Sequence, residues 1–206
     1  MSNLMDYLDW RGDLTFREAP FNEVDNLILA QLVYVEFAGI VPAPGEEGTI
    51  TVKEACELFF AAHDRKEIME RVSMTKTAAF VLEKMAQTER FCNAQLFGYI
   101  NDISKEEQSQ FSVVCVRLDD KSIYVSFSGT DNTIVGWREN FNMGYLSETP
   151  GQLKAVDYLN HMVKEDWKKI RVGGHSKGGN LSVYASVKCD RNIQKRIVKV
   201  YSNDGP

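Results

Sequence analysis

The segment KKIRVGGHSKGGNLSVYAS, residues 168–186, constrains the fold of this chain more than any other. It starts with a short strand-like run, passes through a glycine-rich turn that holds Ser176, and continues as a helical pattern. Strand and helix patterns alternate from residue 122 onward, and this alternation predicts an α/β layered domain with a mostly parallel sheet and flanking helices.

The first part of the chain has a different character. Its apolar residues keep helical spacing, with Asn22 as a plausible N-cap of one helix and Thr51 with Glu54 as a capping box of another. We therefore expect a helical N-terminal region, residues 1–90, packed on or capping the sheet, and an α/β core over residues 91–206. A length of 206 residues suits one domain, or one domain with a small appendage.

The remaining elements follow from local patterns. Residues 110–131, QFSVVCVRLDDKSIYVSFSGTD, are rich in β-branched and aromatic residues around a polar break and predict a β-hairpin. The other expected elements are helices at 64–72, 75–87, 132–141 and 149–167, and strands at 169–174 and 196–204.

Charge and cysteine usage exclude several classes of protein. A net charge of −5 argues against a nucleic-acid surface, which needs clustered cations. The start of the chain lacks the basic and apolar regions of a signal peptide, and no apolar run is long enough to predict a transmembrane segment. We therefore expect a cytoplasmic protein. Four cysteines stand far apart without metal-ligand spacing, so we expect free thiols and no metal: Cys56, Cys92, Cys115 and Cys189.

The turn at Gly174-His175-Ser176-Lys177-Gly178 fits the pattern G-x-S-x-G. Its setting between a strand and a helix is the setting of a nucleophile elbow, a sharp turn that exposes a reactive serine. Glycines at 174 and 178 would relieve crowding where strand and helix cross. The start of the helix would offer unpaired N–H groups to a developing oxyanion. A structural glycine-rich turn without chemistry is the alternative.

Several segments together resemble a known family. VGGHSKGGNLSVYAS is similar to the elbow of α/β-hydrolases, especially of class 3 lipase-like proteins, and VSFSGTD resembles the strand end that carries their first oxyanion donor. PFNEVDNLILAQLVYVEF, FSGTDNTIVGWRENFNMGY and YSNDGP extend the resemblance over nearly the whole chain, to a bacterial family of lipase-like hydrolases, the Mbeg1-like family.

The resemblance implies an α/β-hydrolase-like fold and a role for each matching residue. Ser176 matches the nucleophile, and Thr130 matches the oxyanion residue that donates through its backbone N–H and its hydroxyl. The backbone N–H of Lys177 would be the second donor. Because lipases usually have an apolar residue at the position of Lys177, its charge argues against a long-chain ester substrate.

A serine nucleophile needs a base, and α/β-hydrolases order the residues as serine, acid, histidine. No histidine follows Ser176. We expect His63 and His161 to be ordinary helix residues and His175 to be a structural hydrogen-bonding residue. Asp204, at the end of the strand that follows the elbow helix, is a candidate acid, and a turn-forming role is the alternative. We therefore expect the C-terminal part of the fold to be missing from this chain, which leaves an exposed sheet edge.

The sequence thus predicts a serine hydrolase that cleaves an acyl ester, with a small-molecule or lipid ester as substrate and no cofactor. The alternative is a catalytically silent protein of the same fold that serves as a binding or scaffold module. A nucleotide-binding module is disfavoured because the turn does not fit the phosphate-binding pattern GxxxxGK[ST]. Four apolar residues after the oxyanion strand could line an acyl pocket or a lid, or simply pack a helix on the sheet: Trp137, Phe141, Met143 and Tyr145.

Overall fold

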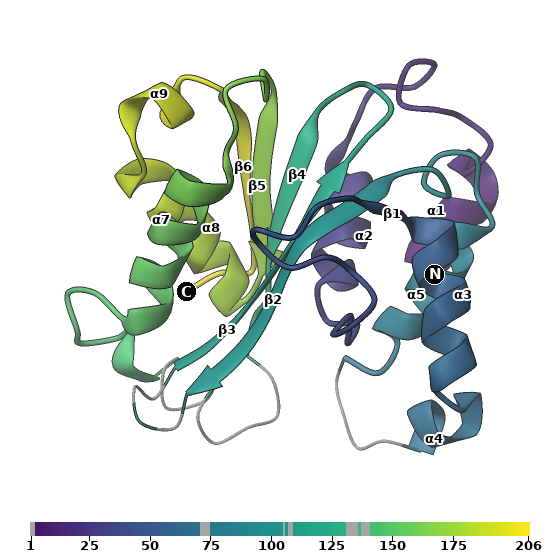
Figure 1. Ribbon diagram of the computed structural model, residues 1–206, viewed down its shortest axis with the longest axis horizontal. Coiled ribbons are helices and arrows are strands. Elements are labelled where there is room, and N and C mark those ends of the chain that lie inside the picture. The colour runs from purple at the N-terminus through teal and green to yellow at the C-terminus, as the bar shows by residue number, and fades with distance from the viewer. Residues whose placement is uncertain (1–2, 71–74, 105, 107–108, 131–135, 137–140) are drawn as a thin grey trace.

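The computed structural model describes residues 3–70, 75–104, 106, 109–130, 136 and 141–206. Their centre is an open six-stranded sheet with the strand order β1-β2-β3-β4-β5-β6 (Figure 1). The strands are β1 (Ile50–Thr51), β2 (Gln95–Ser104), β3 (Ser109–Arg117), β4 (Ile123–Phe127), β5 (Ile170–His175) and β6 (Ile197–Asn203). β6 forms one edge of the sheet.

The prediction of a mostly parallel sheet is wrong. The pairs β1–β2, β2–β3 and β3–β4 are antiparallel, and the pairs β4–β5 and β5–β6 are parallel. Short connections, such as residues 118–122 between β3 and β4, allow antiparallel hairpins, whereas parallel pairing needs a long crossover. The fold is therefore mixed α/β, with an antiparallel half that meets a parallel half at β4.

Helices cover both faces of the sheet (Figure 1). On one side lie α1 (Leu4–Arg11), α2 (Glu23–Leu32), α3 (Val52–Ala62), α4 (Arg65–Glu70) and α5 (Ala78–Ala86). On the other lie α7 (Pro150–Met162), α8 (Lys177–Lys188) and α9 (Arg191–Gln194). α2 packs on β4 and β5, and α8 packs on β5 and β6 from the opposite face. Among the helices of the described residues, none is both long enough and apolar enough to cross a bilayer.

The predicted helix starts at Asn22 and Thr51 are confirmed. Asn22 Oδ1 accepts a hydrogen bond from the Val24 N–H at 2.8 Å, at the first turn of α2. Thr51 and Glu54 form a reciprocal capping box, with bonds of 3.1 and 2.9 Å between each side chain and the other residue's N–H. These bonds satisfy donors that the first helical turn leaves unpaired.

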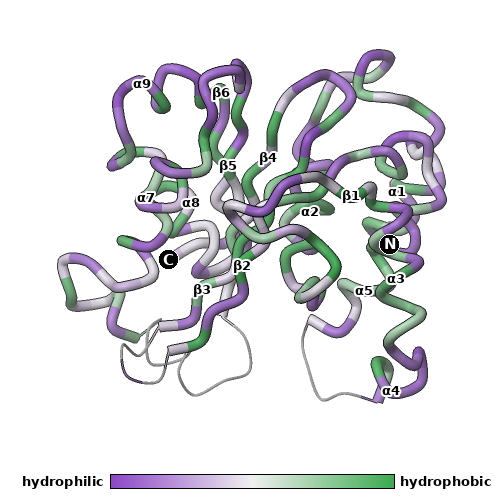
Figure 2. Tube along the Cα trace, viewed as in Figure 1, coloured by the Kyte–Doolittle hydropathy of each residue, from purple (hydrophilic) through white to green (hydrophobic). Residues whose placement is uncertain are grey.

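Each face of the sheet has its own hydrophobic core. Successive side chains of β4 alternate between the two cores, since Tyr124 joins the cluster under the N-terminal helices and Val125 joins the cluster under α7 and α8. Hydrophobic residues accordingly concentrate on the central strands and on α2, and the outer loops are hydrophilic (Figure 2). The N-terminal helices therefore bury their apolar faces against the sheet itself.

A buried ion pair fixes the chain that precedes α2. Asp25 and Arg90 are both 0% exposed, and the guanidinium donates to both carboxylate oxygens, at 2.7 and 2.6 Å. The same guanidinium donates to the carbonyls of Leu14 and Ala19, at 2.9 and 3.1 Å. One side chain thereby holds an irregular segment against the residues that lead into β2.

Candidate active site

Ser176 lies on a sharp turn between β5 and α8. Its φ of 54° and ψ of −126° are in a region that non-glycine residues rarely occupy, and its side chain is half-buried. The turn is fixed on both sides, because the Ser176 N–H donates to the Asn203 carbonyl at 2.8 Å and its own carbonyl accepts from the Gly179 N–H at 2.8 Å. The serine is therefore held in a strained conformation at the start of a helix.

Two glycines allow the turn to cross the end of β4 at close range. A methyl group on Gly174 would lie 2.3 Å from the Phe127 carbonyl oxygen, and one on Gly178 would lie 2.1 Å from the same oxygen. Real Cβ contacts are essentially never this short, so only glycine fits either position without movement of the backbone. The end of β4 is thus brought directly against the elbow.

The residues after β4 include Thr130, which the sequence predicts as an oxyanion donor. A methyl group on Gly129 would lie 3.4 Å from Ser176 Cβ, which places the Gly129–Thr130 peptide beside the serine. Thr130 Oγ1 is buried and has no hydrogen-bond partner among the described residues. A buried hydroxyl without a partner is costly, and such groups call for a functional explanation.

The Lys177 ammonium group does not face Ser176. Its side chain is completely buried, and the ammonium donates to the backbone carbonyl of Gln110 and, at 3.0 Å, to its side-chain Oε1. The interpretation that this charge argues against a long-chain ester therefore has no geometric support. At the turn, Lys177 therefore contributes its backbone and not its side chain.

The three histidines have different settings. His63 Nδ1 lies 2.9 Å from the Phe59 carbonyl, and exposed His161 lies 2.8 Å from the Asp157 carbonyl, so both are ordinary helix residues as expected. The ring of His175 has no hydrogen-bond partner within the described ranges, so the expected structural bond is not found. Among the residues that the structure describes, no hydrogen bond joins a histidine side chain to Ser176 Oγ.

The candidate acid, Asp204, lies just after β6. It is exposed and has a φ of 54°, a value that asparagine and aspartate tolerate in turns. Within the described residues its carboxylate makes no hydrogen bond or ion pair. The structure therefore places Asp204 in a turn near the elbow without joining it to Ser176.

The neighbouring Asn203 is a site residue that the sequence reasoning missed. Its side-chain amide donates to the Gly174 carbonyl at 3.0 Å, and its Oδ1 accepts from Asn26 Nδ2 at 2.8 Å. Asn26, 2% exposed on α2, also accepts from the Tyr124 hydroxyl at 2.7 Å. The one sequence signal for this network was Asn26, a polar residue within the apolar pattern of residues 24–35. This network fastens the elbow to α2.

A second missed residue is Tyr34, in the turn that ends α2. Its hydroxyl oxygen accepts the Gly129 N–H at 2.8 Å. Burial raises the pKa of this phenol, and the Gly129 hydrogen bond opposes part of that rise. The hydroxyl therefore stays protonated at neutral pH.

Aromatic residues gather after the oxyanion strand. Phe141 and Tyr145 are 75% and 65% exposed and meet edge to face, with ring centroids 5.6 Å apart, so the expectation that they pack a helix on the sheet is wrong. Met143 does pack against the core under α7. Trp137 and most of the expected helix at 132–141 lie outside the described residues.

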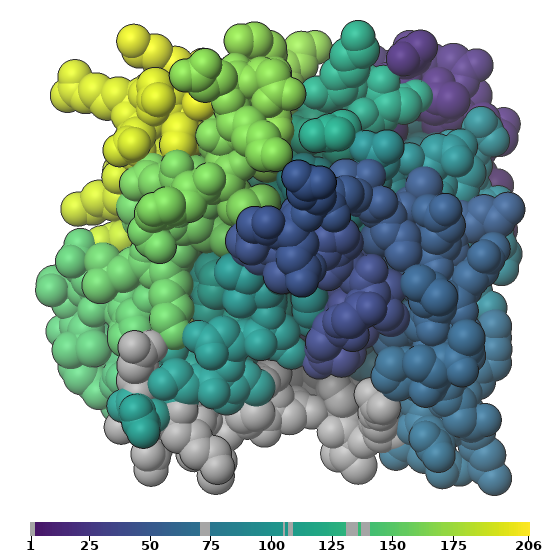
Figure 3. Space-filling model, in the orientation of Figure 1, coloured from purple at the N-terminus to yellow at the C-terminus, as the bar shows by residue number. Residues whose placement is uncertain are grey.

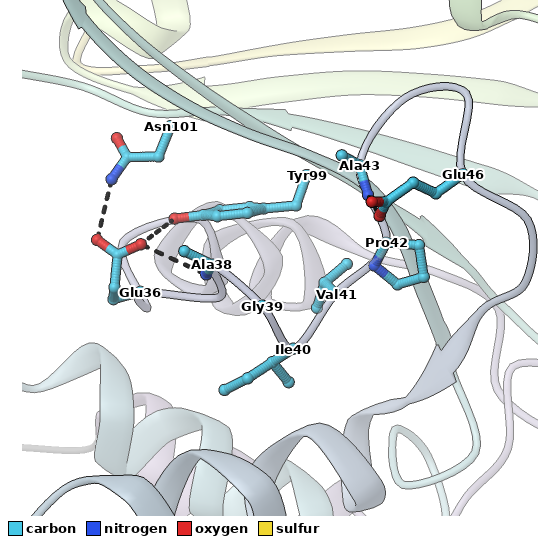
Figure 4. Close-up of a pocket in the computed structure, with 10 residues that line it drawn as sticks. All are labelled: Glu36, Ala38, Gly39, Ile40, Val41, Pro42, Ala43, Glu46, Tyr99 and Asn101. Carbon is cyan, nitrogen blue, oxygen red and sulfur yellow. Dashed lines mark hydrogen bonds between the residues drawn. The ribbon is translucent and has the colours of Figure 1, made fainter.

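A separate cavity of about 480 Å³ lies beside the chain that joins α2 to β1 (Figure 4). The carboxylate of Glu36 faces it and accepts hydrogen bonds from Asn101 Nδ2 at 3.0 Å and the Tyr99 hydroxyl at 3.3 Å. The same connection, dark blue in Figure 3, crosses the middle of this face of the molecule. Ser176 does not line the cavity, so the elbow is a different site.

The comparisons with known proteins give one match. A family model described as Mbeg1-like matches residues 85–206, which include β2 to β6 and all the elbow residues. No curated protein and no solved structure matches the chain. Among the described residues, no group of histidine, cysteine, aspartate and glutamate side chains could hold a metal ion.

Proposed function

The chain belongs to the Mbeg1-like family, and we propose that it is a serine hydrolase of the α/β-hydrolase type that cleaves acyl esters. The observation that carries the proposal is the conformation of Ser176. A strained φ of 54° at a half-buried serine, between a parallel strand and a helix, is the arrangement that a nucleophile elbow requires. Strain of this kind persists where the surrounding structure enforces it, often at functional sites.

The proposed reaction proceeds by covalent catalysis. Ser176 Oγ forms a bond to the acyl carbon and gives up its proton to a base, and the carbonyl electron pair moves to the oxygen. The Thr130 N–H and hydroxyl and the Lys177 N–H donate to that oxyanion. The alcohol then leaves with a proton, and water hydrolyses the acyl-enzyme. A lipid ester or a smaller ester fits this chemistry.

One observation favours a second candidate function. His63 and His161 are held by their own helices, and no histidine bonds to Ser176 within the described ranges. A serine without a base is a poor nucleophile. The second candidate is therefore a catalytically silent protein of this fold that binds a ligand or a partner at the elbow.

Labelling with a fluorophosphonate separates the two candidates. We expect the purified chain to label, the Ser176→Ala variant not to label, and Ser186→Ala to label like the wild type. Ser186 is a matched control, because it is a serine of α8 that donates an ordinary bond to the Ser182 carbonyl at 2.7 Å. Labelling that persists in Ser176→Ala would exclude Ser176 as the nucleophile, and residues 1–206 that never label would favour the binding module.

A further inference from the structure

The Tyr34 hydroxyl lies close to the elbow that carries Ser176. α2 runs along β4, since the Ser126 hydroxyl donates to the Leu29 carbonyl at 2.9 Å, so the end of α2 reaches the end of β4. There a methyl group on Gly129 would lie 2.4 Å from Tyr34 Oη and 3.4 Å from Ser176 Cβ. The phenol oxygen and the serine therefore both lie beside Gly129, together with the His175 carbonyl oxygen, 2.6 Å from the same methyl position.

The Tyr34 hydroxyl accepts a hydrogen bond but donates none within the described residues. Its oxygen accepts the Gly129 N–H at 2.8 Å, but its own O–H has no acceptor among the residues that the structure describes. Tyrosine hydroxyls that are largely buried usually find a partner for this donor. An O–H group whose oxygen already accepts a hydrogen bond is also a stronger donor, because hydrogen bonds in a chain polarise one another.

We propose that Tyr34 is a further catalytic residue, whose hydroxyl donates a hydrogen bond to the substrate oxygen that becomes negative when Ser176 attacks. The inference rests on the proposed serine hydrolase activity. No proton leaves the phenol: its O–H bond stays intact while the carbonyl electron pair moves to oxygen. The Gly129 N–H fixes the phenol oxygen, so the donor is oriented before substrate binds, as electrostatic stabilisation of an oxyanion requires.

The test compares phosphonylation rates of the wild type and Tyr34→Phe with two probes, an alkyl fluorophosphonate and its P=S counterpart. Sulfur accepts hydrogen bonds poorly, so a donor aimed at this atom makes the P=O probe react faster than the P=S probe. We expect Tyr34→Phe to slow the P=O reaction about 10- to 100-fold, somewhat less than the typical loss of one oxyanion-hole donor. The P=S reaction should slow much less.

Tyr99→Phe is the matched control. Tyr99 is a buried tyrosine whose hydroxyl bonds to Val35 and Glu36 and not to the residues around Ser176. It should leave both rates unchanged. Equal slowing of both probes by Tyr34→Phe would mean that Tyr34 only positions Gly129, and unchanged rates would mean that it has no role; either result overturns the inference. A wild type that does not label at Ser176 removes the proposed hydrolase activity, and the role of Tyr34 with it.

Discussion

Ser176 occupies a conformation that glycine adopts freely, so Ser176→Gly should stabilise the fold while it removes the nucleophile. With φ at 54° and ψ at −126°, the serine backbone stores about 1–3 kcal/mol. Glycine also gives the unfolded chain more conformational freedom, and this offsets about 0.4–1 kcal/mol of the strain that is relieved. The net gain in the free energy of unfolding is therefore about 0–2.6 kcal/mol. For a domain of this size, such a gain raises Tm by up to about 10 °C.

Scanning calorimetry of three variants tests this reasoning. Ser176→Ala keeps Cβ and its strain, so it should change Tm little and should separate the loss of the hydroxyl from the relief of strain. Ser186→Gly, at an ordinary helical position of α8, should lower the free energy of unfolding by about 1 kcal/mol. The reasoning is refuted if Ser176→Gly lowers Tm as Ser186→Gly does, because the turn then stores no strain that glycine can release.

Three other substitutions have defined expectations. Arg90→Met leaves the Asp25 carboxylate buried without its partner and should cost about 3–5 kcal/mol in urea unfolding; a cost below 1 kcal/mol would contradict the role of the pair. Gly178→Ala places a methyl group 2.1 Å from a β4 carbonyl oxygen and should lower stability by about 1–3 kcal/mol in thermal unfolding, and an unchanged Tm would show that the crossing has room. Asn203→Ala leaves the Gly174 carbonyl without its side-chain donor and should cost about 1–3 kcal/mol and slow fluorophosphonate labelling; normal labelling at reduced stability would limit Asn203 to a structural role.

The parallel half of the sheet was predictable because its signals are local. Residues 169–174 and 196–204 are short strand-like runs separated by a helical pattern, and the structure has β5, α8 and β6 there. β2 was missed because its sequence, QLFGYINDIS, contains a glycine and ends in polar residues. Gly98 has a φ of 64° where the register with β3 shifts, so the strand bends within its own length. A bent, partly polar strand lacks the alternation that sequence patterns detect.

In the candidate site too, the residues with local sequence signals were predictable and the distant ones were not. The serine and its glycines could be identified because a strand, a turn and a helix follow one another in 168–186. Tyr34 and Asn203 lie far from the turn in sequence and meet it only because α2 and β6 pack beside it. Nothing in the residues around Tyr34 marks it as a partner of Ser176, and beside Asn203 the sequence favoured Asp204, the candidate acid. Contacts of this kind depend on the topology of the sheet, which the sequence predicted only in part.

The strand order also bears on how the chain folds. In the described sheet every strand pairs with its neighbour in sequence, but the connections differ greatly in length. Residues 118–122 close the β3–β4 hairpin, whereas residues 128–169, which include α7, separate β4 from β5 in the sequence. Because ordering a longer connection costs more entropy, we expect the antiparallel strands to assemble early and β5 to dock on them late. The strained turn would then form only on a sheet that is already folded, and the folded strands would supply the contacts that hold it.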